Sequence, residues 1–430
     1  MNNIEEVTMA LEAGQLPVGS SQKLLEEVAR SELDSDDFAL TLTAGSAIGD
    51  NYIGVLFRAR AECRRSGRAL NIIVKLPPQN EARRNQFFAH PAFEREIYFY
   101  DTIYPVLEEF QREKGIALED GDGFYQVPRC LKTCVREYEE AIFMADLKQE
   151  GFEMFDRHKE QGLEHFRLVV KTLGKLHALS FALRDQQPER FEPFRAMVEL
   201  FTTRDDDASM EQWFQALVTR ALETLDEKAE PEVYEKTRDA LKVNFLDQIR
   251  ELTKGASAEP YAVICHGDCW NNNVMFKHDE HDTPVDIRLL DWQICRYASP
   301  VLDLMYFLFT ASTKAFRDAH YEDLLTLYHD TLSSFLRRLG SDPERLFPRT
   351  ALDDQLVRFG RFGLLMAAML LPIITTKSED IPDLDGMAEK LENGFDVSSE
   401  INNFKSEGTQ DIYREKMAGC CRDMVRLGYI

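Results

Sequence analysis

One segment of the chain holds polar side chains at a spacing that suits phosphoryl transfer. Residues 263–276 read VICHGDCWNNNVMF, so two apolar runs enclose a polar stretch in which Asp268 stands five positions before Asn273. In the catalytic loops of phosphotransferases, this spacing joins an aspartate that accepts the proton of an attacking hydroxyl to an asparagine that binds magnesium. The pattern predicts Asp268 as the catalytic base and Asn273 as a metal ligand.

A second aspartate follows the next apolar run. Residues 286–290 read DIRLL and lead directly into Asp291-Trp292-Gln293. Kinases place a metal-binding aspartate at the same point, after the strand that follows the catalytic loop. Because the hard oxygen donors of Asn273 and Asp291 suit Mg²⁺, we expect these two residues to share the ion. The order of the two motifs favours this interpretation over one in which the aspartates are turn and cap residues.

A lysine and a glutamate lie where a nucleotide-binding ion pair is expected. Lys75 ends the apolar run of residues 72–74, and Glu96 lies on the apolar face of a helix predicted over residues 92–110. Such a lysine holds the α- and β-phosphates and is steadied by a glutamate of the next helix. Glu94 is close in sequence but points to another face. The alternative for Lys75 is a surface lysine whose stem lies along apolar neighbours.

Between the first two predicted strands lies a candidate phosphate loop, residues 45–51, which read GSAIGDN. Gly45, Ser46, Gly49 and Asn51 could supply tight turns and backbone N–H groups for phosphate oxygens. The G-x-G-x-x-G spacing is absent, and an ordinary hairpin turn would use the same residue types.

Three further polar residues are predicted to support the site. His266 precedes Asp268 by two positions, and we expect it to bond to the backbone or near the metal loop. His177 lies in an apolar helical pattern and is expected to be a core or supporting histidine. Asp303 is expected to cap a helix and to brace the catalytic loop through backbone hydrogen bonds.

The predicted elements give an α+β fold in two lobes. Strands are expected over residues 38–43, 52–59, 69–75, 126–134 and 140–144, which make a mainly antiparallel sheet with one long helix. Beyond residue 147 the chain is predicted to be helical, apart from a strand pair around Asn273. We therefore expect a helical extension over 1–37, an N-lobe over 38–144 and a C-lobe over 145–430.

The bulk properties exclude several classes of function. The chain has 430 residues and a net charge of −24, which disfavours nucleic acid as a partner. Its start lacks a signal-peptide pattern, and the most apolar stretch, residues 363–376, is too short to span a bilayer, so it is expected to be a buried helix. Eight cysteines without a framework spacing suggest a reducing, cytoplasmic location. We interpret the two C-x₃-C pairs, which begin at Cys130 and Cys265, as buried or half-buried thiols rather than zinc ligands.

Together these motifs resemble the insect ecdysteroid kinase-like family, also described as choline-kinase-like. That family belongs to the aminoglycoside phosphotransferase and choline kinase fold, which is related to protein kinases. The resemblance runs from about residue 43 to about residue 338. It rests on G-D-N-Y at 49–52, I-V-K at 73–75, F-x-x-E-x-x-x-Y at 93–100, D-L at 146–147, G-F at 151–152, H-A at 177–178, H-G-D-x-W-x-x-N at 266–273, D-W-Q at 291–293 and D-L at 303–304.

The resemblance implies a bilobed fold, ATP and Mg²⁺ as cofactors, and phosphorylation of a hydroxyl on a small molecule such as an ecdysteroid. It makes Lys75 and Glu96 the nucleotide ion pair and places adenine against the backbone between Met144 and Asp146. One departure from the family pattern is Ala145, where a glutamate is frequent. Because backbone holds adenine there, little effect is expected.

The acceptor is expected to be an uncharged or cationic, largely apolar alcohol, with no obligate protein partner and no membrane. Aromatic positions of the C-lobe, namely Trp213, Phe214, Phe245 and Phe362, suggest an apolar pocket, although each could be ordinary core. Alternatives are a choline or ethanolamine kinase, a catalytically idle kinase fold that binds a ligand, and a metallohydrolase built on His266, Asp268, Asp279 and His281.

Overall fold

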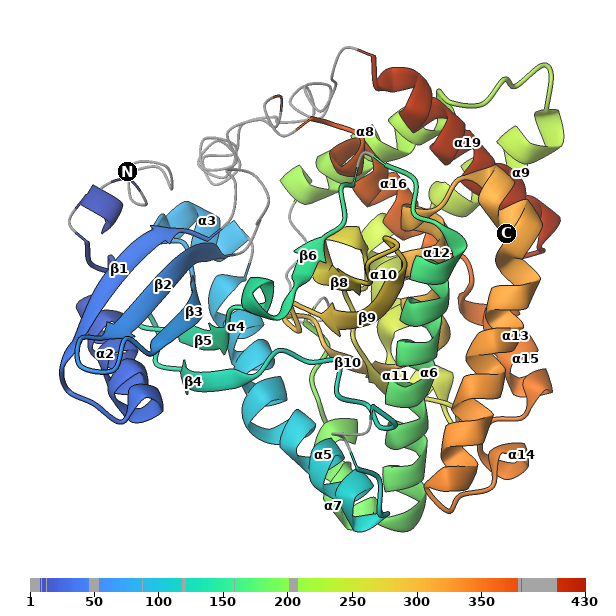
Figure 1. Ribbon diagram of the computed structural model, residues 1–430. Helices are drawn as coiled ribbons and strands as arrows, with labels where there is room; N and C mark the ends of the chain where they lie inside the picture. The colour runs from blue at the N-terminus through green and yellow to red at the C-terminus, as the bar shows by residue number, and fades with distance from the viewer. Residues whose placement is uncertain are drawn as a thin grey trace.

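The computed structural model describes residues 8, 10–12, 14–45, 54–86, 88–117, 121–157, 159–200, 208–377, 380 and 408–430. A twisted sheet with its flanking helices forms one part of the molecule, and a larger, mainly helical body forms the other (Figure 1). This is the predicted α+β fold, with its antiparallel sheet before residue 146 and most of its helices after it.

The N-terminal sheet has five antiparallel strands in the order β1-β2-β3-β5-β4. Residues of β2 alternate between buried and more exposed positions, as expected for a sheet with one face on a core. Lys75 of β3 lies opposite Leu56 of β2 and Ile142 of β5, so it sits in the middle of the sheet. Their bounds are β1 Phe38–Ala44, β2 Val55–Cys63, β3 Ala69–Leu76, β4 Cys130–Cys134 and β5 Ala141–Ala145. All five predicted strands are present, although β4 is shorter than expected.

Helices flank this sheet and lead from it toward the helical body (Figure 1). Helix α2 (Gly19–Leu33) buries Leu25 and Ala29, and α3 (Glu81–Gln86) follows β3. The helix predicted over 92–110 is longer and is not uniform: α4 (Ala89–Tyr98) passes through a π-helical turn (Phe99–Ile103) into α5 (Tyr104–Glu113). Pro105 has no N–H to give to the carbonyl four residues earlier, which accounts for a change of hydrogen-bond register at this point.

Two small antiparallel sheets lie where the two parts meet. After the junction come a 3₁₀ turn (Leu147–Glu150) and β6 (Phe152–Met154), which pairs with β8 (Val274–His278); β8 pairs in turn with β9 (Pro284–Leu289). The strand before the catalytic loop, β7 (Val263–Cys265), belongs to a different sheet and pairs with β10 (Arg296–Ala298). The predicted catalytic loop, residues 266–273, therefore runs from one sheet to the other.

Helices form the remainder of the second part. The longest two, α6 and α13, lie side by side, and Gly174 allows their close approach because a Cβ there would lie 3.1 Å from the Tyr328 carbonyl oxygen. Helix α12 is buried along its whole length. Their bounds are α6 Leu163–Gln186, α7 Pro188–Arg195, α8 Ala208–Leu222, α9 Pro231–Leu241, α10 Phe245–Thr253, α11 Gly255–Ala258, α12 Val301–Ala311, α13 Lys314–Arg338, α14 Pro343–Leu346, α15 Arg349–Phe359, α16 Phe362–Ile374 and α19 Gln410–Arg426.

The apolar stretch near residue 370 forms the buried helix α16, as the sequence predicted. Within the described ranges, no single helix has the length and apolar composition to cross a membrane. The pair Pro343–Phe359 and Phe362–Ile374, which is bent by 56°, meets that test only when the two helices are taken together.

Candidate active site

A cavity of about 540 Å³ lies between the sheet and the helical body. Most of the residues that the sequence singled out for a nucleotide and a metal meet in its lining, although they come from distant segments of the chain. They are Gly45, Lys75, Glu96, Met144, Asp146, Asn273 and Asp291. Ser46, Gly49 and Asn51 lie outside the described residues, so the predicted phosphate loop is represented only by Gly45.

Lys75 lies between two carboxylates at the back of the cavity. Its Nζ atom is 2.6 Å from Glu96 Oε2 and 2.9 Å from Asp291 Oδ1. Gln293 fits against the same pair: with its amide nitrogen donating to Asp291 Oδ1 at 3.0 Å, its oxygen accepts from Lys75 Nζ at 2.9 Å. The predicted contact between Lys75 and Glu96 is therefore present, and it includes Asp291 as well.

The charges of this cluster do not balance. Burial by itself disfavours the Lys75 ammonium, but Asp291 and Glu96 together raise the Lys75 pKa above its ordinary value. Burial also raises the pKa of Glu96, against the opposing effect of Lys75. One cation thus faces two carboxylates, and this excess of negative charge favours a further cation at the open side of Asp291.

Asp268 is held by a hydrogen bond on each oxygen. Its Oδ2 atom accepts from Asn273 Nδ2 at 2.8 Å, and its Oδ1 atom accepts from the Tyr306 hydroxyl at 2.6 Å. Burial and then the Asp291 charge raise the pKa of Asp268 to about 6. The carboxyl group is therefore mainly ionised at neutral pH and can accept a proton.

The backbone of the catalytic loop is fixed by a buried aspartate. Asp303 of α12 accepts from the His266 N–H at 2.7 Å and from the Gly267 N–H at 2.9 Å. A third partner is His177 Nε2 at 3.2 Å. The prediction that Asp303 braces this loop is confirmed. The prediction that it caps a helix is wrong, because its carboxylate bonds to the loop, whereas the Val301 N–H at the start of α12 donates to the Ser299 hydroxyl oxygen at 3.3 Å.

His266 is a supporting residue, as predicted. Its Nε2 atom lies 2.9 Å from the Leu290 carbonyl oxygen, and its Nδ1 atom lies 3.2 Å from the Asp268 backbone nitrogen. These partners require a neutral ring that donates from Nε2 and accepts at Nδ1. Burial lowers the pKa of His266, which agrees with that neutral form. Since both ring nitrogens are engaged, His266 links the catalytic loop to the strand before Asp291.

The loop after Asp291 is anchored on the helix that carries Glu96. The Trp292 ring is fully buried and stacks on Phe99, with ring centroids 3.7 Å apart and planes 6° apart. Arg95 adds a hydrogen bond of 2.6 Å to the Cys295 carbonyl oxygen. Asp291 itself has a left-handed backbone, with φ of +64°. These contacts hold the aspartate and the helix as one unit.

The junction between the two parts lines the opposite end of the cavity. The N–H groups of Ala145 and Asp146 bond to the carbonyl oxygens of Arg129 and Asn71 on flanking segments. The Asp146 carboxylate accepts from Arg58 Nε at 2.6 Å and from the Lys148 N–H at 3.1 Å. Asp146 therefore ties β2 to the junction in addition to lining the cavity.

Two of the residues that define the site were missed by sequence reasoning. Tyr306 lies within an apolar helical run, and Arg58 is one of two arginines on β2. Neither position belongs to a motif with a known spacing, so only a tertiary contact could find them. Gln293 was part of the quoted D-W-Q motif, but its place between Lys75 and Asp291 also had to come from the fold.

The residues present fit a magnesium ion. The Asn273 amide nitrogen donates to Asp268, so the amide oxygen is left as the atom that can bind a metal. The Asp291 side chain is 22% exposed and faces the cavity, and its hydrogen bonds with the described residues use only Oδ1. An amide oxygen and a carboxylate in one cavity form a hard-oxygen donor set of the kind that Mg²⁺ prefers.

Comparison with known proteins places these residues in a family context. The family described as "Ecdysteroid kinase-like family" matches residues 48–341 of the chain, a stretch that contains Lys75, Glu96, Asp268, Asn273 and Asp291. A 4-hydroxytryptamine kinase of Psilocybe cyanescens is 43% identical over 42 residues, which are 10% of this chain and 12% of that enzyme.

Two solved structures also align with most of the chain. An ethanolamine kinase of Plasmodium vivax has 11% sequence identity and a TM-score of 0.38, with 93% of this chain and 96% of that one covered. A GDP and kanamycin complex of an aminoglycoside phosphotransferase has 9% identity and a TM-score of 0.41, with 90% and 99% covered.

Proposed function

Because the chain belongs to the ecdysteroid kinase-like family, we propose that it is a small-molecule phosphotransferase, and from this premise we propose its cofactors, its residue roles and its acceptor class. The proposed reaction is the transfer of the γ-phosphoryl group of ATP, with Mg²⁺, to a hydroxyl of an ecdysteroid or another lipophilic alcohol. The observation that carries the proposal is the meeting of Lys75, Glu96 and Asp291 at one point, beside Asn273.

In this proposal the back of the cavity receives the nucleotide phosphates. Lys75 contacts the α- and β-phosphates while Glu96 keeps its ammonium group in place. Asn273, through its amide oxygen, and Asp291, through its carboxylate, hold Mg²⁺, which neutralises phosphate charge. At the other end of the cavity the Leu147 N–H is a candidate donor to adenine, because the N–H groups of Ala145 and Asp146 already bond to neighbouring segments.

Asp268 acts on the acceptor. The acceptor oxygen forms a bond to the γ-phosphorus as the bond from that phosphorus to the β,γ-bridging oxygen breaks. The hydroxyl proton passes to the Asp268 carboxylate, and ADP and the phosphate ester are the products. A carboxyl group with a pKa of about 6 can both take up this proton at neutral pH and release it afterward.

The acceptor class rests on net charge and on the family match rather than on the aromatic residues named from the sequence. Phe214 and Phe245 stack on each other with centroids 4.4 Å apart, and both are core residues, as is Phe362. Met154, Phe155 and Met275 line the cavity assigned to the nucleotide, and Asp268 is not among its lining residues, so these side chains say nothing of the acceptor. The family match supports a lipophilic alcohol as the acceptor, and the net charge of −24 disfavours an anionic one.

A panel assay tests the proposal. ADP release and the mass of the phosphorylated product would be measured with Mg·ATP and an ecdysteroid, choline, ethanolamine or a plant phenol. We expect an ecdysteroid or another lipophilic alcohol to react fastest; choline or ethanolamine as the best acceptor would favour the alternative kinase class. Binding of Mg·ATP without any product would favour an idle kinase fold.

Two variants sharpen this assay. Asp268→Asn should lower kcat by on the order of 100-fold or more, because the acceptor loses its base, while Mg·ATP affinity is nearly kept. Asp279→Asn is the matched control, because Asp279 organises an exposed turn by accepting from the His281 and Thr283 N–H groups. Loss of activity in Asp279→Asn alone would instead support the metallohydrolase interpretation.

A further inference from the structure

Tyr306 is a buried residue with a polar contact that the reaction outlined above does not use. It lies on α12 and is 3% exposed. Its hydroxyl donates to Asp268 Oδ1 at 2.6 Å, within the range of a charge-assisted hydrogen bond to a carboxylate. The contact joins residues 38 positions apart, so it depends on how α12 packs beneath the catalytic loop.

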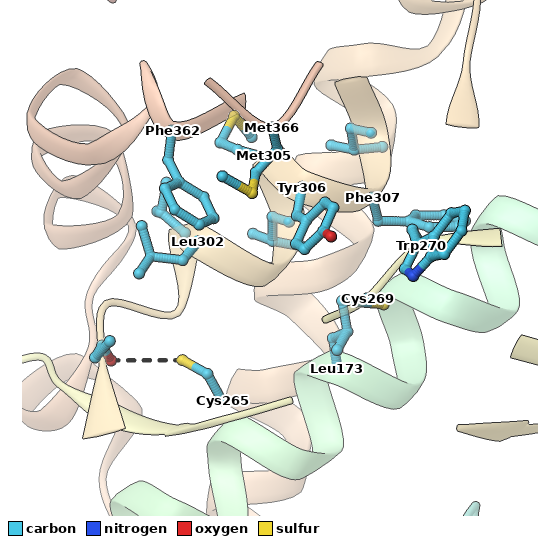
Figure 2. Packing of buried hydrophobic residues seen from close by; sticks show 14 of the residues in the cluster. Leu173, Cys265, Cys269, Trp270, Leu302, Met305, Tyr306, Phe307, Phe362 and Met366 are labelled. Carbon is cyan, nitrogen blue, oxygen red and sulfur yellow. Dashed lines mark hydrogen bonds between the residues drawn. The ribbon is translucent and has the colours of Figure 1, made fainter. Parts of the chain in front are cut away.

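Apolar side chains pack around the Tyr306 ring, and its hydroxyl points toward the loop that carries Asp268. Its ring lies edge-on to Phe362 of α16, with centroids 6.2 Å apart. In Figure 2 the ring is enclosed by apolar side chains, and its oxygen points to the side on which Cys269 and Trp270 lie. These two residues directly follow Asp268. A side chain confined in this way loses little entropy when it donates to a fixed acceptor.

The two hydrogen bonds to Asp268 are not equivalent. Asn273, a proposed metal ligand, donates to Oδ2, whereas Tyr306 of the buried helix α12 donates to Oδ1. With one bond on each oxygen, the carboxylate cannot rotate freely about its Cβ–Cγ bond, and each oxygen keeps a lone pair for a further partner. The direction in which the acceptor hydroxyl must approach is thereby fixed.

We propose that Tyr306 is a positioning residue for phosphoryl transfer, which orients the Asp268 carboxylate toward the acceptor hydroxyl. This inference rests on the proposed function, since it assigns Asp268 to the acceptor. Tyr306 acts through Asp268: its hydroxyl bonds to that carboxylate, and Tyr306 is not among the residues that line the cavity proposed for the nucleotide. Its removal should therefore affect transfer and not nucleotide binding.

Tyr306→Phe is the direct test, because it deletes one oxygen and keeps the ring. Phosphoryl transfer would be measured with ecdysone as the acceptor, and with water as the acceptor when no alcohol is present. We expect kcat to fall by about 10- to 100-fold, the range set by loss of one hydrogen bond to a charged group, with the Mg·ATP dissociation constant changed by less than about 2-fold.

Tyr321→Phe is the matched control. Tyr321 of α13 is also buried, and its hydroxyl bonds to the Tyr429 hydroxyl at 2.8 Å, so the same deletion is made away from Asp268. Its kcat should stay within about 2-fold of the parent. If Tyr321→Phe lowered kcat as much as Tyr306→Phe does, the effect would be one of general packing and the inference would be wrong.

A double mutant separates positioning through Asp268 from every other role. In an Asp268→Asn background, Tyr306→Phe should add less than about a 3-fold loss, because residues that act as a unit are not additive. If the kcat losses of the two single variants multiplied in full in the double mutant, the inference would be contradicted. If Asp268→Asn is inactive and Tyr306→Phe is fully active, the inference is wrong but the proposed function stands. A fully active Asp268→Asn overturns the proposed function and the inference with it, and so does a parent that phosphorylates no alcohol of the panel and does not hydrolyse ATP.

Discussion

At the scale of single residues, the contacts of the Lys75 ammonium group organise the back of the cavity. Its ammonium group contacts Glu96 and Asp291 together, at 2.6 and 2.9 Å. In the proposed reaction Asp291 turns to the metal and Lys75 turns to the phosphates, so one contact is exchanged while the contact with Glu96 remains. The buried cluster is therefore ready for a cation before the nucleotide arrives.

Replacing Lys75 should impair both binding and transfer. For Lys75→Met we expect the KM for ATP to rise and kcat to fall, each by at least about 10-fold, because the lysine orients the phosphates through charge-assisted hydrogen bonds. Steady-state kinetics with varied Mg·ATP would measure both. Lys132→Met is the control, since Lys132 is an exposed lysine of β4 outside the cavity lining. Parent-like kinetics for Lys75→Met would rule out this role.

Replacing Asp291 should weaken the binding of the metal and, with it, of Mg·ATP. In Asp291→Asn the charge is lost, but the left-handed backbone at φ of +64° remains acceptable, because asparagine tolerates that conformation. Mg·ATP affinity, measured by calorimetry, should fall at least about 10-fold, because an acidic protein then faces the triphosphate with a weaker bridging ion. Asp286→Asn is the control: Asp286 lies on β9 and pairs with Arg288. Equal affinity in Asp291→Asn and the parent would exclude Asp291 as a ligand.

At the scale of elements, two loops are held by two helices. The catalytic loop is braced by Asp303 at the start of α12, and the loop after Asp291 is anchored on α4 and the π-helical turn through Arg95 and Phe99. The His266 ring connects the two loops. Since each brace is buried, both loops are ordered by packing and not only by the ligand.

Gly267 makes this arrangement sensitive to a single methyl group. Its φ is +89°, and a Cβ would lie 2.0 Å from the Ile294 carbonyl oxygen. Gly267→Ala should lower the free energy of unfolding by at least about 2 kcal/mol, as measured by urea denaturation. Gly67→Ala has a similar φ of +70° with open space around it, so it should cost only about 1 kcal/mol. Equal costs for the two variants would show that the close approach to Ile294 is unimportant.

At the scale of the whole molecule, a net charge of −24 acts on every ligand that approaches. Lys75, Arg58, Lys148 and Arg157 lie in the cavity lining, but Glu96, Asp146, Asp156 and Asp291 lie there too. The cavity is therefore not strongly positive. Long-range electrostatics should therefore attract cationic acceptors, repel anionic ones and leave neutral ones unaffected.

A salt series checks this expectation. The kcat/KM ratio between a neutral acceptor such as ecdysone and an anionic one such as ecdysone sulfate should exceed about 10 at low ionic strength. The ratio should shrink as salt is raised from about 20 to about 300 mM, because screening then shortens the reach of the protein charge. A ratio that stays constant over this range would mean that direct contacts, and not net charge, exclude the anion.

The sequence by itself identified the candidate residues of the site and the order of the elements that carry them. The D-x-x-x-x-N spacing and the D-W-Q motif are local patterns, and each follows an apolar strand, so Asp268, Asn273 and Asp291 could be named without a structure. The five strands of the N-terminal sheet followed from the same alternation of apolar residues. Periodicity did not reveal the π-helical turn or the shorter β4, because neighbouring segments of the fold decide where regular hydrogen bonding stops.

Contacts between distant segments were decided only by the tertiary structure. Tyr306 reaches Asp268 from an apolar helix, Arg58 reaches Asp146 across the sheet, and Asp303 turns from its own helix to the catalytic loop. A side chain's type states which bonds it can make, but its partner depends on which elements pack side by side. That choice is made by burial of apolar surface over the whole chain, which has no short-range signal in the sequence.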